Sequence, residues 1–126
     1  MLLSQSVPLA PLQALMAREF PDASLQSFTE LRKALNFIKK SKPQLVIAEF
    51  LYAPTYGSQL SNFEALCATL QRHSPRSQLI ALVAHPDHQH IERLNRNVEI
   101  HAELTLPLNL DALAETIRKL QIQATH

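Results

Sequence analysis

The stretch Lys42-Pro43-Gln44-Leu45-Val46-Ile47-Ala48-Glu49-Phe50 decides the fold, because a proline leads into an apolar run that only one carboxylate interrupts. A run of this length without polar alternation is typical of a strand buried on both faces of a parallel sheet. Open α/β sheets place their sites at the carboxyl ends of such strands. Glu49 stands at that end, so it is the first candidate functional residue of the chain.

On either side of this strand, apolar segments alternate with helical patterns. Strands are expected at 2–3, 23–28, 45–50, 79–84 and 98–105, and helices at 9–19 and 88–95 and after the capping residues Thr29, Ser61 and Asn109. This alternation requires parallel pairing and right-handed crossovers. We therefore predict a single α/β domain over residues 1–126. Its five-stranded parallel sheet would be doubly wound, in three layers, with the strand order 2-1-3-4-5 of flavodoxin-like folds.

Composition excludes several classes of function. Twelve Lys and Arg against eleven Asp and Glu leave a formal charge of +1, which calls for neither nucleic acid nor an anionic membrane. No apolar run approaches membrane-spanning length, and residues 1–6 lack the basic start of a signal peptide. The single cysteine, Cys67, lies on an apolar helix stripe and is expected to be a buried, inert thiol. One cysteine also suits the reducing cytoplasm, where we expect the protein.

Four segments, in order and spacing, resemble a response-regulator receiver domain over nearly the whole chain. Residues 42–49 are similar to the strand that carries the phosphorylated aspartate of that family, with Glu49 in the aspartate's place. Pro54 and Gly57 match the proline and glycine that follow. Residues 79–84 resemble the strand that ends in a Thr or Ser and then Ala. Residues 104–107 resemble the strand end with Lys-Pro, where the resemblance implies a cis peptide bond.

The departures from the family all fall on its active site. The acidic positions that hold Mg²⁺ in receivers match Ser4, Gln5 and Ser6 of this chain. The position of the hydroxyl and the alanine after it match Val83 and Ala84. The lysine and the proline after it match Leu106 and Pro107. The aromatic switch position matches Glu103. Magnesium prefers carboxylate oxygen, and phosphoryl transfer depends on positioning and charge stabilisation. We therefore expect a degenerate pocket without a metal, a cofactor, a catalytic residue or phosphorylation at Glu49.

The resemblance then implies a pseudo-receiver, a non-enzymatic signalling or regulatory module that binds a partner protein. The family's usual contact surface is the fourth helix, fifth strand and fifth helix, which would also serve a homodimer. In this chain that surface includes His88, Arg93, Arg96, Glu103 and Arg118. The alternative is a flavodoxin-like domain that binds a small molecule or catalyses a reaction in the strand-end pocket near Glu49. A ligand site should gather several polar groups, which Val83 and Leu106 disfavour.

Two further alternatives concern single sites. Glu49 is either a fixed mimic of a phosphorylated aspartate or a solvated carboxylate in an inactive pocket, and the second is favoured because neither a lysine nor a hydroxyl is expected beside it. His85, His88 and His90 form a His-x-x-His-x-His cluster that has metal-ligand character, with His101 as a candidate further ligand. A polar loop and helix face is the favoured interpretation, since neither a cysteine nor a further placed carboxylate completes the set.

Overall fold

The structure is a computed structural model that describes residues 1–4, 7–49, 62–84 and 100–124. The strands are β1 (Leu2–Leu3), β2 (Ser27–Phe28), β3 (Leu45–Glu49), β4 (Gln78–Ala84) and β5 (Ala102–Leu106). The helices are α1 (Leu9–Glu19), α2 (Leu31–Ser41), α3 (Asn62–His73) and α5 (Leu110–Ala124). The strands pair in parallel in the order β2-β1-β3-β4-β5, which confirms the predicted topology. The expected fourth helix lies outside the described residues.

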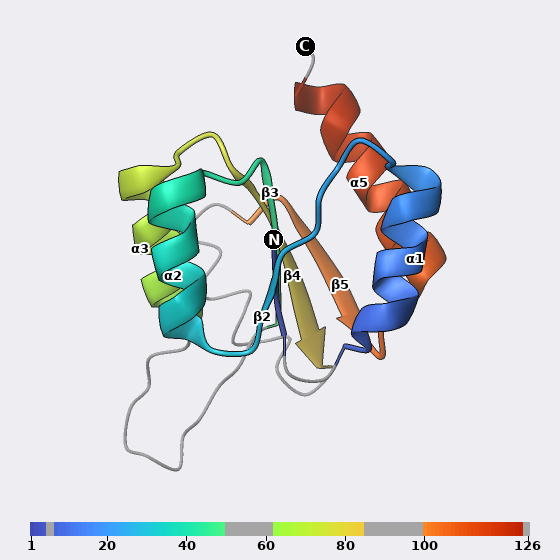
Figure 1. The fold of residues 1–126 in the computed structure, drawn as a ribbon, viewed down its shortest axis with the longest axis horizontal. Coiled ribbons are helices and arrows are strands. Elements are labelled where there is room, and N and C mark those ends of the chain that lie inside the picture. The colour runs from blue at the N-terminus through green and yellow to red at the C-terminus, as the bar shows by residue number, and fades with distance from the viewer. Residues whose placement is uncertain (5–6, 50–61, 85–99, 125–126) are drawn as a thin grey trace.

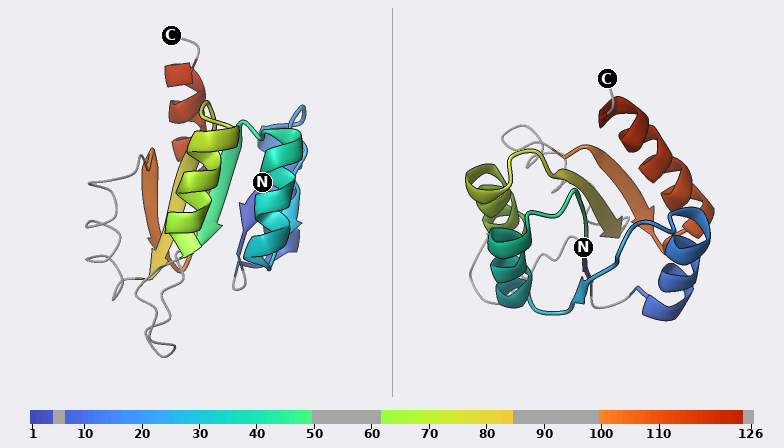
Figure 2. Two further views of the ribbon diagram at one scale, coloured as in Figure 1. Left: turned by 90° about the vertical axis from the view of Figure 1, so that its left-hand side faces the viewer. Right: turned by 45° about the horizontal axis from the view of Figure 1, so that its top comes forward.

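Alternation of side chains along the buried strands builds two hydrophobic layers. In β3, Val46 and Ala48 pack toward α2 and α3, whereas Ile47 packs toward α1 and α5. Figure 1 shows the two helix pairs on opposite faces of the sheet, and the left view of Figure 2 looks onto α2 and α3. Both faces of β3 and β4 are therefore covered, which is why their sequences are apolar without alternation.

The ends of the elements differ from the predictions where tertiary contacts decide them. Strand β2 has two residues rather than six, because its only partner is the two-residue β1. Strand β5 begins at Ala102 rather than Val98. Just before it, the imidazole Nδ1 of His101 accepts the backbone N–H of Leu79 at 3.0 Å. The His101 imidazole thus takes the Leu79 N–H that a backbone carbonyl would accept if the strand were longer.

The helix caps give one confirmation and one correction. Asn109 caps α5, since its Oδ1 accepts the N–H groups of Asp111 at 2.9 Å and Ala112 at 3.1 Å. Thr29 was expected to cap α2, but the residue at that position is Glu30, which makes no side-chain capping bond. Helix α2 ends at Ser41 and is followed by Lys42 in the left-handed conformation, with φ of 47°.

Two smaller expectations are tested by the described residues. The Leu106–Pro107 peptide bond is cis, as predicted. Cys67 is buried, as predicted, and burial raises the pKa of its thiol to about 11, which favours the protonated, unreactive form. None of the described helices combines the length and the apolar composition needed to cross a membrane.

Candidate functional site

The candidate site lies where β1 and β3 end at the carboxyl edge of the sheet, the lower edge in Figure 1. Ser4 follows β1 directly and Glu49 is the last residue of β3. Leu3 pairs with Ala48 in register, so the next residue of each strand also lies alongside the other. Parallel pairing therefore brings together two side chains that are 45 positions apart in sequence.

Ser4 and Glu49 are joined by a buried hydrogen bond. The Ser4 hydroxyl donates to Glu49 Oε2 at 2.9 Å and accepts the backbone N–H of Val7 at 3.0 Å. Ser4 is 8% exposed and Glu49 is 7% exposed. A buried carboxylate is destabilising unless donors replace its water, and the serine hydroxyl is one such donor. In the described part of the chain, every buried polar side-chain atom has a partner.

This geometry corrects the interpretation of Glu49 as a solvated carboxylate beside which no hydroxyl stands. The error has a physical source, because Ser4 was treated only as a residue that lacks a carboxylate. A serine immediately after the first strand also carries a hydroxyl, and the strand order 2-1-3 places that hydroxyl next to the end of β3. The prediction that Ser4 belongs to the pocket around Glu49 is consistent with this contact.

The positions that match the receiver hydroxyl and lysine carry hydrocarbon that packs in the core. Val83 is 1% exposed and belongs to the layer under α2 and α3. Leu106 is partly buried and packs in the layer under α1 and α5. Ala84 pairs with Leu106 between β4 and β5, and Pro107 is exposed. Gln5 and Ser6 lie outside the described residues.

A receiver fold raises the question of Mg²⁺ at this edge, and the described residues fit it poorly. Ser4 and Glu49 together supply one hydroxyl and one carboxylate, whereas magnesium requires octahedral oxygen ligation. Within the described ranges, no group of three His, Cys, Asp or Glu side chains is placed to hold a metal ion. His85, His88 and His90 lie outside those ranges, so the histidine metal hypothesis stays a prediction. His101 already uses Nδ1 as an acceptor for Leu79.

The predicted partner surface is described at two of its five residues. Glu103 is exposed on β5. Arg118 on α5 donates a hydrogen bond to Glu19 on α1, and this bond is the main cause of the lowered pKa of the Glu19 carboxyl. Arg118 is therefore tied to α1, a contact that its position on the α5 sequence did not predict. His88, Arg93 and Arg96 lie outside the described residues.

Sequence reasoning missed a second feature, an open groove of about 1140 Å³ at the opposite, amino edge of the sheet. It is bordered by the α2–β3 loop, the α3–β4 loop and the last turns of α5. The arrangement of three loops around one hollow has no signal in any single segment of the sequence. Both sheet edges thus carry polar groups, but only the carboxyl edge was anticipated.

Comparison with known proteins finds similar folds among solved structures. No protein-family model and no curated protein matches the sequence. The chain is similar to the solved structure of a response regulator receiver domain protein from Clostridium thermocellum, with a TM-score of 0.70 and 16% identity over 94% of this chain and 88% of that one. A response regulator from Thermotoga maritima matches with a TM-score of 0.66 and 17% identity, over 95% and 93%.

A third solved structure, an adenylate cyclase from Rhodopirellula baltica, matches with a TM-score of 0.70 and 18% identity, over 98% of this chain and 86% of that one. Identities this low establish the fold and nothing finer. The chain has the fold of a response-regulator receiver domain, as the sequence motifs indicated.

Proposed function

We propose that residues 1–126 form a pseudo-receiver, a non-catalytic signalling or regulatory domain that is not phosphorylated and acts by binding a partner protein. The observation that carries this proposal is the carboxyl edge of the sheet. Glu49, in the phosphoacceptor position, is 7% exposed and hydrogen-bonded to Ser4, while Val83 and Leu106 stand where receivers have a hydroxyl and a lysine.

The physical argument concerns the partners of a transferred phosphoryl group. Such a group carries negative charge, and its transfer needs cations and donors aimed at its oxygens. Val83 and Leu106 offer neither, and Ser4 with Glu49 makes a poor metal cage. An acceptor carboxylate with little exposed surface is also poorly accessible to a phosphodonor. The Ser4–Glu49 hydrogen bond instead stabilises the pairing of β1 and β3 at their carboxyl ends.

The interaction surface in this proposal is the fourth helix, β5 and α5, with a partner protein or a second copy of the chain on it. Glu103 contributes from the exposed side of β5, which alternates exposed and partly buried residues. Arg118 adds a charge on α5 that is shared with Glu19. The lone cysteine continues to favour the cytoplasm as the place of action.

The experiment is phosphorylation by acetyl phosphate in the presence of Mg²⁺, read by intact mass. We expect no mass gain in the wild-type chain, while a competent receiver domain treated in parallel gains one phosphoryl group. The control variant is Glu49→Gln, which replaces the acceptor carboxylate by an amide that cannot form an acyl phosphate. A stoichiometric phosphoryl gain in the wild type that Glu49→Gln abolishes would overturn the proposal.

A further inference from the structure

The groove at the amino edge, the upper edge in Figure 1, is built by loops that strand pairing brings together. One wall is the α2–β3 loop, a second is the α3–β4 loop, and a third is the C-terminal half of α5. Its volume of about 1140 Å³ exceeds that of a single small ion and is at the upper end of small-molecule pockets. An extended segment of chain fits such an open groove better than a compact ligand.

The charge of the lining has one sign. Lys42 and Arg76 line the groove together with His73 and His101, and among the described residues that line it none is Asp or Glu. The whole chain is close to neutral, with twelve basic and eleven acidic residues. The groove is therefore a local concentration of positive charge on a protein that has almost no net charge, and this complementarity points to an anionic occupant.

The two full cations are held by a rigid frame. Ser77 N–H donates to Ser74 O at 3.0 Å, which closes a turn with Pro75 at its second position. The Ser74 and Ser77 hydroxyls are 2.6 Å apart, both residues are buried, and Ser77 Oγ also donates to the carbonyl of Pro43. This last bond joins the two loops, so Arg76 on one loop and Lys42 on the other keep a defined separation.

Lys42 carries a further sign of a constrained position. It has φ of 47°, and it is the sole non-glycine residue with positive φ in the described part of the chain. Glycine is favoured at this place after a helix, because a side chain adds about 1 kcal/mol or more of strain there. Lys42 therefore places a cation at the groove although its backbone conformation is destabilising.

Helix dipoles explain some of the basic residues at the amino edge of the sheet but not all of them. Lys39 and Lys40 lie in the last turn of α2 and Arg72 in the last turn of α3, where cations stabilise the negative helix ends. Arg76 lies three residues beyond α3, past the range of that effect. Lys42 and Arg76 are exposed, and the ion pairs in the described ranges do not include either of them.

We propose that the amino-edge groove binds an acidic peptide segment of a partner protein, with carboxylates at Lys42 and Arg76. Leu45 is partly exposed in the same hollow and offers an apolar contact to a side chain between those carboxylates. A peptide is favoured over nucleic acid because no Phe, Tyr or Trp is among the described lining residues to stack on bases. The inference shares with the proposed function only the premise that this chain binds protein, and it uses a different surface.

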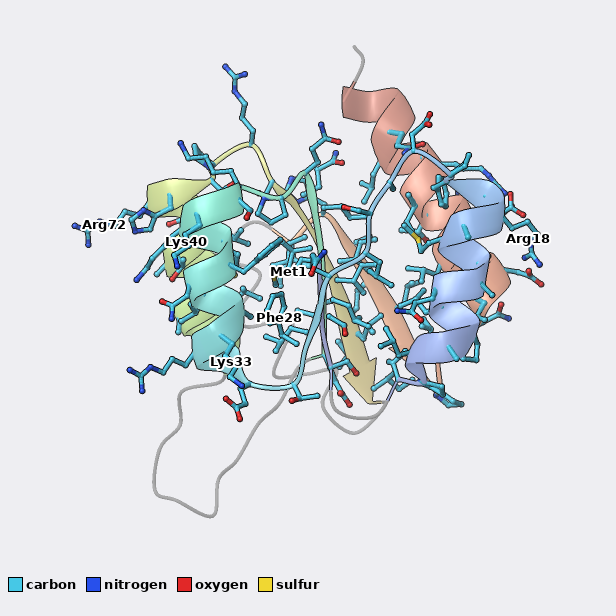
Figure 3. All side chains as sticks on the ribbon, viewed as in Figure 1. Met1, Arg18, Phe28, Lys33, Lys40 and Arg72 are labelled. Carbon is cyan, nitrogen blue, oxygen red and sulfur yellow. The ribbon has the colours of Figure 1, made fainter. Side chains whose placement is uncertain are left out.

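The test is fluorescence anisotropy with a dye-labelled synthetic peptide of repeated Glu-Glu-Leu, titrated with the full chain. The double variant Lys42→Glu/Arg76→Glu should weaken binding by about tenfold or more, and high salt should weaken the wild-type affinity. The matched control is Lys39→Glu/Arg72→Glu, which makes the same charge change on the last turns of α2 and α3 but does not line the groove. Figure 3 shows Arg72 pointing away from the sheet. This control should change the affinity by less than about threefold.

Other outcomes count against the inference. Absence of binding, an equal loss in both double variants, or equal binding of a Gln-Gln-Leu peptide would each overturn it. Tighter binding of a labelled oligothymidylate, lost in the Lys42/Arg76 variant, would assign the groove to nucleic acid instead. Thermal unfolding of each variant checks that it folds. Glu49→Gln should leave peptide binding unchanged. Phosphorylation of Glu49 would therefore overturn the proposed function alone, and failure to bind the peptide would overturn the groove proposal alone.

Discussion

The two edges of the sheet handle charge in opposite ways. At the carboxyl edge, Glu49 is buried and satisfied from inside the chain by Ser4. At the amino edge, Lys42 and Arg76 are exposed around an open groove, while buried neutral serines hold the loops beneath them. The first arrangement stabilises the fold and leaves little exposed polar surface for a ligand. The second leaves its charges available, which is what a binding surface requires.

Helix dipoles explain why the signs differ between the edges. In a parallel α/β sheet, helix N-termini collect at the carboxyl edge and helix C-termini at the amino edge, so an anion is favoured at the first and cations at the second. Glu49 and the basic ends of α2 and α3 follow this rule. The comparison teaches that burial, rather than sign, separates an internal structural charge from one that is free to bind.

The largest expected effect comes from removing the donor at the carboxyl edge. Ser4→Ala deletes the bond to Glu49 and the acceptor for the Val7 N–H, and should lower the free energy of unfolding by about 3 kcal/mol, since one of the two bonds involves a charged group. Urea unfolding measures this loss.

Ser77→Ala is the matched change at the amino edge, because it removes two neutral hydrogen bonds, to Pro43 and Ser74. It should lower the free energy of unfolding by only about 2 kcal/mol. Ser41→Ala, at an exposed position, should change it by less than about 0.5 kcal/mol. If Ser4→Ala were as mild as Ser41→Ala, the carboxyl edge would not depend on its internal hydrogen bond.

A second prediction tests a buried amino group at the amino edge. In this 126-residue chain the Met1 α-amino group donates to Leu45 O at 2.9 Å, and burial lowers its pKa from 8.0 to about 6. Between these values the unfolded chain binds more protons than the folded one. The free energy of unfolding should therefore rise as pH increases from 6 to 8, by about 2 kcal/mol.

Urea unfolding across this pH range measures the dependence. The control is a chain with a Gly-Ser extension before Met1. The extension replaces the amine by an amide, which can still donate but cannot titrate, and the Met1 part of the pH dependence should disappear. A slope that the extension leaves unaltered would show that the Met1 amine is not the source of the pH dependence.

The smallest expected effect is that of Glu49→Gln. The amide keeps one oxygen that accepts the Ser4 hydroxyl, while it removes the charge and replaces the second oxygen by an NH₂ group, so the free energy of unfolding should fall by only about 1 kcal/mol. Partner binding should also persist if the functional surface lies elsewhere. Calorimetric titration with a captured partner checks the second point, and loss of binding in this variant would make Glu49 the functional centre.

Local patterns in the sequence predicted most of the secondary structure. The apolar runs at 45–50 and 79–84 correspond to the central strands β3 and β4, and the helical spacing at 9–19 gave α1 with the predicted bounds. Asn109 capped its helix because capping needs only residues two and three positions ahead. Where the outcome depended on a distant neighbour, as for the start of β5 beside Leu79 or the length of β2 beside β1, the predictions were wrong.

The sequence by itself therefore determined the fold class and the strand order, and it showed that positions 83 and 106 carry the hydrocarbon side chains of Val83 and Leu106. These follow from composition, periodicity and the identity of single positions, all of which are local. Only the tertiary structure decided that Glu49 is buried against Ser4, that Arg118 pairs with Glu19, and that Lys42 and Arg76 border one groove. Each of these depends on the register of parallel strands and the packing of helices, which bring together residues that no local pattern connects.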